Sequence, residues 1–161
     1  MVSLVGRSGV GKTTVLVRII GELKRRGRRV GTVKHDAHGF SMDKPGKDTW
    51  RHARAGSDAV VISGPHKMAL IRRLDEEMRL DDIVPLMGDV DLVITEGYKR
   101  GAKPKIEVSR RELGPELVSR STEIIAIVSN HPVNLDVPQY GLDDAPGVAD
   151  LIERLYLSVA A

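Results

Sequence analysis

Cysteine is absent from the 161 residues of the chain, and aromatic residues make up only 3% of them. Without cysteine there can be no disulfide, no iron–sulfur cluster and no zinc site built on thiolates. The low aromatic content argues against a nucleic-acid partner, because proteins bind single strands by stacking bases on aromatic rings. No apolar run approaches the roughly 18 residues of a membrane span, and a glycine-rich loop from Gly6 leaves little room for a signal peptide. We therefore expect a cytoplasmic protein that binds neither nucleic acid nor membranes.

Basic residues are concentrated in one short run. The net charge is +3, and the segment from Lys24 to Arg29 reads KRRGRR. Such a run is typical of a helix C-terminus, where cations favour the helix dipole. The alternative is an anion-binding surface, for which phosphorylated small molecules are the expected ligands.

Apolar runs and amphipathic segments alternate along the sequence, which is 41% apolar and can bury one core. Strands are predicted at residues 2–5, 29–34, 58–63, 67–72, 91–95, 105–108 and 123–129. Helices are predicted at residues 13–26, 48–56 and 80–87, and from Asp143 onward. The two strands between residues 58 and 72 predict a hairpin. We predict one α/β domain over residues 1–161, with a mostly parallel sheet, helices on both faces and an antiparallel edge.

Residues 6–13 (GRSGVGKT) match the pattern G-x-x-x-x-G-K-[ST] in full. They lie between a predicted strand and a predicted helix, which is the context of a phosphate-binding P-loop. Glycines let successive backbone N–H groups point at phosphate oxygens, and the helix N-terminus adds a positive dipole end. We expect Lys12 to face solvent without a ligand and to reach the β- and γ-phosphates, and the Thr13 hydroxyl to ligate Mg²⁺.

Two acidic residues follow predicted strands at the edge where ligands of such sheets bind. Asp36 follows the second predicted strand, and Glu96 directly follows the apolar strand DLVIT. Carboxylates at this point commonly hold Mg²⁺ directly or through water, so Asp36 and Glu96 are the candidate metal and catalytic residues. The alternative for Asp36 is a loop residue that bonds its own backbone. His35 and His38 flank Asp36 and are either transition-metal ligands or ordinary loop histidines.

Two further loops are dense in charge. Residues 43–51 (DKPGKDTWR) form either a solvated loop capped by Asp48 or a mobile loop over phosphates. Residues 98–103 (YKRGAK) form a basic loop that starts at the edge of the sheet where the nucleotide is expected. This loop is either an incidental surface patch or an anion-binding site. The base-reading run N-K-x-D of many guanine-specific P-loop proteins is missing, although Asn130 follows a late strand and could face a base edge.

Longer segments of the chain resemble the MobB family, the molybdopterin-guanine dinucleotide biosynthesis adaptor proteins. The resemblance covers nearly the whole chain and rests on the segments GRSGVGKTT, TVKHDAHGF, DKPGKDTWR, RAGSDAVVISG and DLVITEGYKRGAKPKIEV. The D-x-P-G-K-D and EGYK runs are specific to the family, whereas the P-loop alone occurs in many unrelated proteins.

The resemblance implies a P-loop NTPase-type fold that binds GTP and Mg²⁺, hydrolyses GTP slowly at most, and is therefore no more than a weak GTPase. It implies a homodimer that assists a separate molybdenum cofactor guanylyltransferase, which joins GMP to the phosphate of molybdopterin. The matching motif assigns nucleotide contacts to Gly9, Val10, Gly11, Lys12, Thr13 and Thr14. It assigns the metal side to Thr13, Asp36 and Glu96. Asp48 and the loop from Lys99 to Lys103 are candidate contacts to a molybdopterin-type ligand or to the partner.

Two other functions compete with this one on the residues alone. A small P-loop kinase needs arginines that clamp the transferred phosphoryl group, and Arg72, Arg73 and Arg79 are available for it. A GTP-dependent metallochaperone would use His35 and His38 for nickel. Slow hydrolysis is expected because the single glutamine, which could orient water, is in a late loop.

Overall fold

The computed structural model describes residues 1–114 and 116–157, and its backbone divides into two compact units. Unit 1 comprises Met1–Asp36 and Met87–Ala161, and unit 2 comprises Ala37–Leu86. Each unit has a sheet of its own. The prediction of one domain over residues 1–161 stays a prediction.

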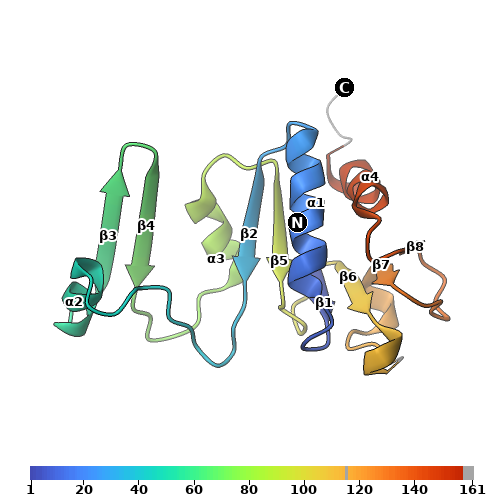
Figure 1. Cartoon of the computed structure of the whole chain (residues 1–161), viewed down its shortest axis with the longest axis horizontal. Helices are drawn as coiled ribbons and strands as arrows, with labels where there is room; N and C mark the ends of the chain where they lie inside the picture. Colours follow the sequence, from blue (N-terminus) through green and yellow to red (C-terminus); the bar gives the residue numbers. More distant parts are fainter. Residues whose placement is uncertain (115, 158–161) are drawn as a thin grey trace. The chain divides into compact units, whose positions relative to one another are not determined.

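Unit 1 is built on a six-stranded sheet in the order β2-β5-β1-β6-β7-β8 (Figure 1). The strands are β1 Val2–Gly6, β2 Val30–Lys34, β5 Leu92–Glu96, β6 Lys105–Ser109, β7 Ile124–Ser129 and β8 Gln139–Tyr140. Neighbouring strands all run parallel, so their carboxyl ends meet at one edge. All five residues of β1 are buried, which agrees with its mostly apolar sequence and its central place in a parallel sheet. The predicted, mostly parallel α/β fold is confirmed.

Two long helices complete the core of unit 1 and contact each other: α1 Lys12–Arg25 and α4 Ala145–Tyr156. α1 buries one stripe of side chains, namely Val15, Leu16, Ile19 and Leu23. α4 begins where the Asp144 carboxylate accepts a hydrogen bond from the N–H of Gly147 at 3.0 Å. Both apolar stripes join side chains of the sheet in one core cluster. Within the described residues, no helix is long and apolar enough to cross a membrane.

The basic run from Lys24 to Arg29 closes α1 and is held by acidic side chains. Arg26 donates to Glu22 Oε1 at 2.7 Å and to Glu153 Oε2 at 2.8 Å, so it joins α1 to α4. Hydrogen bonds from Arg25 and then Arg26 lower the pKa of Glu22 to about 2. The pairing of Arg25 and Arg26 within the protein favours the interpretation of this run as a helix end.

Unit 2 holds two short helices and a hairpin: α2 Asp48–Arg54, β3 Ala59–Gly64, β4 Lys67–Arg72 and α3 Leu80–Ile83. β3 and β4 pair antiparallel along their whole length and form a separate two-stranded sheet, beside which α2 contacts β3 (Figure 1). The prediction that this hairpin forms an edge of the main sheet is therefore wrong. The edges of the main sheet are β2 and β8, both in parallel pairs.

Two further elements differ from expectation. The helix predicted at residues 80–87 ends as an α-helix at Ile83 and continues as a 3₁₀ helix, η1 Val84–Met87. Pro85 explains the change, because it lacks the N–H that an α-helical turn requires. β8 is absent from the predicted strands, because two residues are too few to show a strand periodicity.

Gly6 is the residue at which β1 turns into the glycine-rich loop, and its backbone leaves no room for a side chain. Its φ is 144°, and a Cβ atom there would lie 2.4 Å from the carbonyl oxygen of Val108 in β6. We expect Gly6→Ala to lower the free energy of unfolding by about 1–3 kcal/mol, the range for a strained backbone position. Urea denaturation measures this difference.

Gly21 in α1 is the matched control, because no described atom lies within 4 Å of the Cβ that a substitution would add. Gly21→Ala is expected to raise the free energy of unfolding by about 0.5–1 kcal/mol through helix propensity. Equal stability of the wild type and Gly6→Ala would contradict the close approach of β1 and β6.

Candidate nucleotide-binding site

The loop between β1 and α1 is shaped by glycines in the left-handed region. Gly9 has a φ of 75°, and Gly11, the N-cap of α1, has a φ of 92°. The loop therefore leads into a helix N-terminus, whose first N–H groups lack partners inside the helix and attract anions. Thr13 and Thr14 of the first turn are exposed. The side chain of Val10 is buried, which confines any nucleotide contact of this residue to its backbone.

Lys12 is folded over its own loop, and the expectation that it faces solvent is wrong. Its Nζ donates to the carbonyl oxygens of Gly6 at 3.2 Å and of Arg7 at 2.8 Å. The physical reason is that these two carbonyls offer a partly buried ammonium group the acceptors it needs. A phosphate at this point would compete with the carbonyls for the same donor.

Two more lysines lie near Lys12 at the carboxyl edge of the sheet. Partial burial is the main cause that lowers the pKa of Lys12, followed by the charge of Lys99; Glu96 raises this pKa and Lys34 lowers it. Lys34 ends β2, and Lys99 follows β5. The edge thus brings together three cations from three segments, and an anion bound there would relieve their mutual repulsion.

Thr13 and Glu96, two of the predicted metal-side residues, are in direct contact. Thr13 Oγ1 donates to Glu96 Oε1 at 2.8 Å, and Glu96 ends β5, which lies beside β1. Asp36 is exposed and lies two residues beyond β2, where Lys34 pairs with Glu96. Asp36 is therefore at the same edge, one strand further from the loop. Hydroxyl and carboxylate oxygens are ligands that Mg²⁺ prefers, together with water and phosphate oxygens.

The loops that follow β2 and β5 pack on each other. The N–H of His35 donates to the carbonyl oxygen of Glu96 at 2.9 Å, and the rings of His35 and Tyr98 lie 4.7 Å apart. Gly97 has a φ of 99°, and a Cβ atom there would lie 3.3 Å from His35. The His35 ring thus helps to position both loops. In residues 1–114 and 116–157, no group of three or more His, Cys, Asp or Glu side chains is arranged to hold a metal ion.

The two lysines of the basic loop at residues 98–103 act electrostatically on different groups. Lys99 lies near Lys12, whereas Lys103 lies near the amino group of Met1, whose pKa is lowered by burial and then by Lys103. Lys105 anchors the loop from inside the protein: it is completely buried, and its Nζ donates to the carbonyl oxygen of Gly101 at 2.7 Å. Lys99 is therefore beside the P-loop, and Lys103 is beside the start of β1.

Two arginines that the sequence analysis missed hold the P-loop from the other side. Arg110 directly follows β6, and its Nε donates to the carbonyl oxygen of Val10 at 2.9 Å. Arg7 donates to the carbonyl oxygen of Leu113 at 2.6 Å and forms an ion pair with Glu116. The available signal was the position of Arg110 at the end of a strand, but its meaning depends on β6 being the neighbour of β1.

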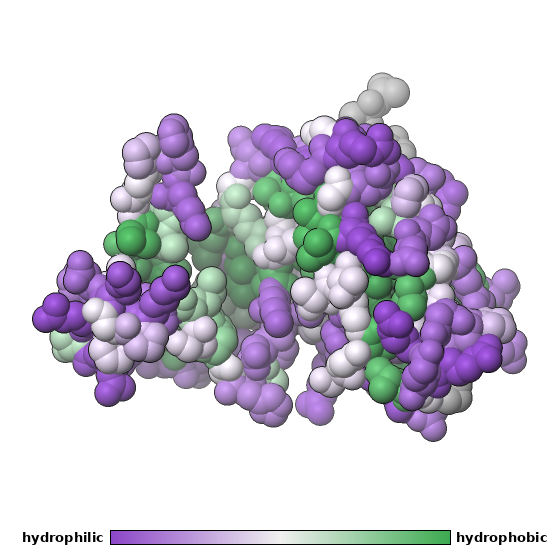
Figure 2. Space-filling model, viewed as in Figure 1, coloured by the Kyte–Doolittle hydropathy of each residue, from purple (hydrophilic) through white to green (hydrophobic). Residues whose placement is uncertain are grey.

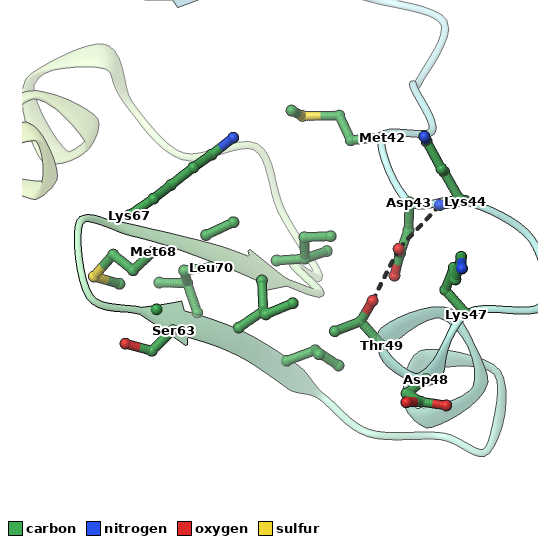
Figure 3. A pocket seen from close by; sticks show the side chains of 15 residues that line it. Met42, Asp43, Lys44, Lys47, Asp48, Thr49, Ser63, Lys67, Met68 and Leu70 are labelled. Atoms are coloured by element: carbon green, nitrogen blue, oxygen red, sulfur yellow. Dashed lines mark hydrogen bonds between the residues drawn. The ribbon is translucent and has the colours of Figure 1, made fainter.

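Unit 2 has a pocket of about 730 Å³ between residues 42–49 and the β3–β4 hairpin (Figure 3). Its lining includes apolar side chains and three lysines, among them Ile62, Met68, Leu70, Lys44, Lys47 and Lys67. Asp43 accepts hydrogen bonds from the N–H of Lys44 at 3.0 Å and from Thr49 Oγ1 at 2.9 Å, which fixes the loop before α2. Asp48, a predicted contact residue, also lines this pocket.

The fold and the site together define a class of protein. A central parallel strand leads through a glycine loop with Lys12 and Thr13 into the N-terminus of a helix. The neighbouring strand supplies the carboxylate of Glu96 to the Thr13 hydroxyl. This arrangement is that of a P-loop NTPase-type fold, whose backbone and lysine bind phosphates.

Comparisons with known proteins narrow this class to one family. Residues 1–130 match the family MobB, described as molybdopterin guanine dinucleotide synthesis protein B. The chain is 34% identical to the molybdopterin-guanine dinucleotide biosynthesis adapter protein of Haemophilus influenzae, over 96% of this chain and 88% of that one. It is 35% identical to the protein of the same name from Escherichia coli, over 90% of this chain and 86% of that one.

A solved structure agrees with the sequence comparisons. The crystal structure of a molybdopterin-guanine biosynthesis protein B (mobB) matches with a TM-score of 0.77 at 35% identity, over 96% of this chain and 98% of that one. The chain belongs to the MobB family, which confirms the resemblance inferred from its sequence motifs.

Proposed function

We propose that this chain is a GTP-binding adaptor of molybdenum cofactor synthesis, and that it assists a separate molybdenum cofactor guanylyltransferase in the cytoplasm. The reaction that it would support joins GMP to the phosphate of molybdopterin. Membership of the MobB family supports the pathway. The observation that supports nucleotide binding is the cluster at the P-loop, where Thr13 contacts Glu96 and the charges of Lys34, Lys99 and Glu96 all act on Lys12.

In this proposal the triphosphate of GTP lies on the loop between β1 and α1. Backbone N–H groups from Gly9 to Thr14 bind phosphate oxygens, and the N-terminus of α1 favours their charge. Lys12 exchanges its bonds to the Gly6 and Arg7 carbonyls for bonds to the β- and γ-phosphates. Lys99 adds a cation from the loop after β5.

Magnesium would neutralise phosphate charge and polarise the γ-phosphate when bound. Thr13 and Glu96 fit such an ion, because a hydroxyl and a carboxylate oxygen already meet beside the loop. Asp36 would act one strand away, through water. Hydrolysis is slow in this proposal, since the only glutamine, Gln139, donates to the carbonyl oxygens of Val133 and Leu135 and so is committed to its own loop.

Glu96 provides the test of the metal assignment. We expect Glu96→Gln to weaken GTP binding in Mg²⁺ by about tenfold, which corresponds to roughly 1.4 kcal/mol, because the carboxylate acts through the cation. Binding in chelator should stay the same or strengthen, since a negative charge near phosphate is removed. Asp36→Asn should show the same direction with a smaller effect. Calorimetric titrations with Mg²⁺ and with chelator measure both affinities.

The control for the metal test is Glu76→Gln, which makes the same change at an exposed position of unit 2. It should leave both affinities unchanged. If Glu96→Gln and Asp36→Asn also leave the Mg²⁺ dependence unchanged, neither residue serves the metal.

The hairpin of unit 2 supports a homodimer. Val61, Met68 and Leu70 share one face of the hairpin and are 56%, 63% and 48% exposed, and the hairpin shows apolar surface in Figure 2. A two-stranded sheet has marginal stability by itself, and large exposed apolar patches mark association surfaces. We place the second copy of this chain on the hairpin, because burying these side chains stabilises the hairpin and the dimer together.

Val61 and its cross-strand partner Leu70 test the dimer. The double variant Val61→Lys with Leu70→Glu removes apolar surface but gives the hairpin a cross-strand ion pair in its place. We expect the dimer dissociation constant to rise at least about tenfold, because each buried side chain contributes roughly 1.5–3 kcal/mol. Analytical ultracentrifugation over a concentration series measures it.

The control for the dimer test is the double variant Asp58→Lys with Arg73→Glu. These two exposed residues lie just before β3 and just after β4. This exchange keeps both the charges and the apolar surface, so the dissociation constant should not move. A dimer that persists unchanged in the Val61–Leu70 variant would show that the hairpin is not the interface.

The pocket of unit 2 is our candidate for the molybdopterin-type ligand. Its lysines suit a phosphate group, and Ile62 and Ala69, on the face of the hairpin opposite the Val61–Leu70 pair, give it an apolar wall that suits a flat ring system. Asp48, which we expected to contact a second phosphorylated ligand or the partner, lines the same pocket.

A reconstituted assay tests the adaptor function. It contains the guanylyltransferase, molybdopterin, GTP and Mg²⁺, and it measures molybdopterin-guanine dinucleotide. This chain alone should form no product, and its addition to the transferase should raise product formation. Lys99→Glu should reduce that stimulation about two- to fivefold, the size expected for an exposed charge near the phosphates.

Lys103→Glu is the matched control from the same loop, because Lys103 lies near Met1 rather than near Lys12. It should leave the stimulation intact. Product formed by this chain without the transferase would contradict the adaptor function. Equal effects of Lys99→Glu and Lys103→Glu on the stimulation would contradict the proposal that Lys99 acts on the phosphates.

A further inference from the structure

Asn130 stands where a guanine-reading N-K-x-D run would begin, but the position of the aspartate is Val133. The structure shows how Asn130 is used. Its Nδ2 donates to the two carboxylate oxygens of Glu112 at 2.9 Å and 3.0 Å, and its Oδ1 accepts the N–H of Arg111 at 3.0 Å. Asn130 therefore holds a carboxylate that comes from another strand end.

We propose that Glu112 selects guanine in this protein, in place of the missing aspartate, and that Asn130 is its positioning residue. The inference rests on the proposed GTP binding and names the group that would recognise the base. Glu112 lies in the short 3₁₀ helix η2, Arg111–Leu113, which follows β6. It is exposed, so its carboxylate can be reached by a ligand.

The turn that carries Glu112 is tied to the P-loop on both sides. Before it, Arg110 donates to the carbonyl oxygen of Val10 at 2.9 Å. At its end, the carbonyl oxygen of Leu113 accepts from Arg7 at 2.6 Å. These two contacts fix η2 beside the loop on which the phosphates would lie.

The order of the strands determines the direction in which a bound nucleotide would extend along the edge of the sheet. β5 and β2, with Glu96 and Lys34 at their ends, lie on one side of β1. β6 and β7, which lead to Glu112 and Asn130, lie on the other side. A nucleotide that places its phosphates and metal toward Glu96 therefore extends its base toward Glu112.

The chemistry of a held carboxylate distinguishes guanine from adenine. Guanine presents two parallel donors, N1–H and the 2-amino group, and a carboxylate can accept both. Adenine presents an acceptor at N1, which a carboxylate repels. Each Glu112 oxygen has a further lone pair beyond its bond to Asn130. Hydrogen bonds from its own backbone N–H and then from Asn130 lower the pKa of Glu112, so the group stays ionised at neutral pH.

Glu112→Gln tests the proposal with a change of preference rather than a loss. An amide offers one acceptor and one donor, which matches the N1–H and 2-oxo groups of xanthine instead of the two donors of guanine. We expect the variant to bind GTP at least about tenfold more weakly and xanthosine triphosphate at least about tenfold more tightly, the range of a bidentate base contact. ATP affinity should not fall, because the amide no longer repels adenine N1. Competition titrations with the three nucleotides in Mg²⁺ measure all of these.

The control is Glu76→Gln, which makes the same change at an exposed position of unit 2. It should keep the wild-type preference for GTP. Asn130→Ala should reduce that preference without creating one for xanthosine triphosphate, because it frees the Glu112 carboxylate but leaves its charge.

Three results would overturn the inference, and they are distinguishable. Wild-type affinities for GTP and xanthosine triphosphate in Glu112→Gln would show that Glu112 does not read the base. An equal loss for all three nucleotides would show a structural role alone. If the wild type binds no GTP, the proposed function fails and this inference fails with it.

Discussion

The site depends on one constraint, which is that β1 lies in the middle of a parallel sheet with its carboxyl end pressed against β6. Every functional group then has to arrive from the same edge, because parallel strands all end there. The close approach at Gly6 sets the start of the loop, and Gly11 at the helix N-cap sets its end. Between these two glycines, the carbonyl oxygens of Arg7 and Val10 accept hydrogen bonds from Lys12 and Arg110, which hold the loop.

The two strands beside β1, β5 and β6, supply different contacts to the two sides of that loop. On the β5 side, Glu96 holds the Thr13 hydroxyl, and the His35–Tyr98 contact fixes the adjoining loops. On the β6 side, Arg110 holds a loop carbonyl. The two lysines whose charges act on Lys12, namely Lys34 and Lys99, also come from the β5 side, at the ends of β2 and β5. In the proposed complex, phosphate and metal chemistry therefore belongs to one side, and the base to the other.

A residue of this site can be predicted from the sequence when a short local motif identifies it, and not when its role depends on which strands are neighbours. The loop from Gly6 to Thr13, with a strand before it and a helix after it, was predicted because the motif and its context are local. Glu96 was predicted because it directly follows the run Leu92–Val93–Ile94–Thr95, which is mostly apolar. Arg110 was missed because its role requires knowing that β6 neighbours β1, and no local pattern encodes strand order. The burial of Lys105 was likewise missed, since the carboxylate that pairs with it, Glu123, lies 18 residues further along the chain.

The central claim is that the loop between β1 and α1 binds GTP through Lys12, and a calorimetric titration of GTP and ATP in Mg²⁺ tests it most directly. The account predicts that the wild type binds GTP more tightly than ATP. It predicts that Lys12→Ala weakens GTP binding at least about tenfold, since a charge-assisted hydrogen bond contributes roughly 1.5–3 kcal/mol. Unchanged GTP affinity in Lys12→Ala, in a variant that melts like the wild type, would contradict the claim.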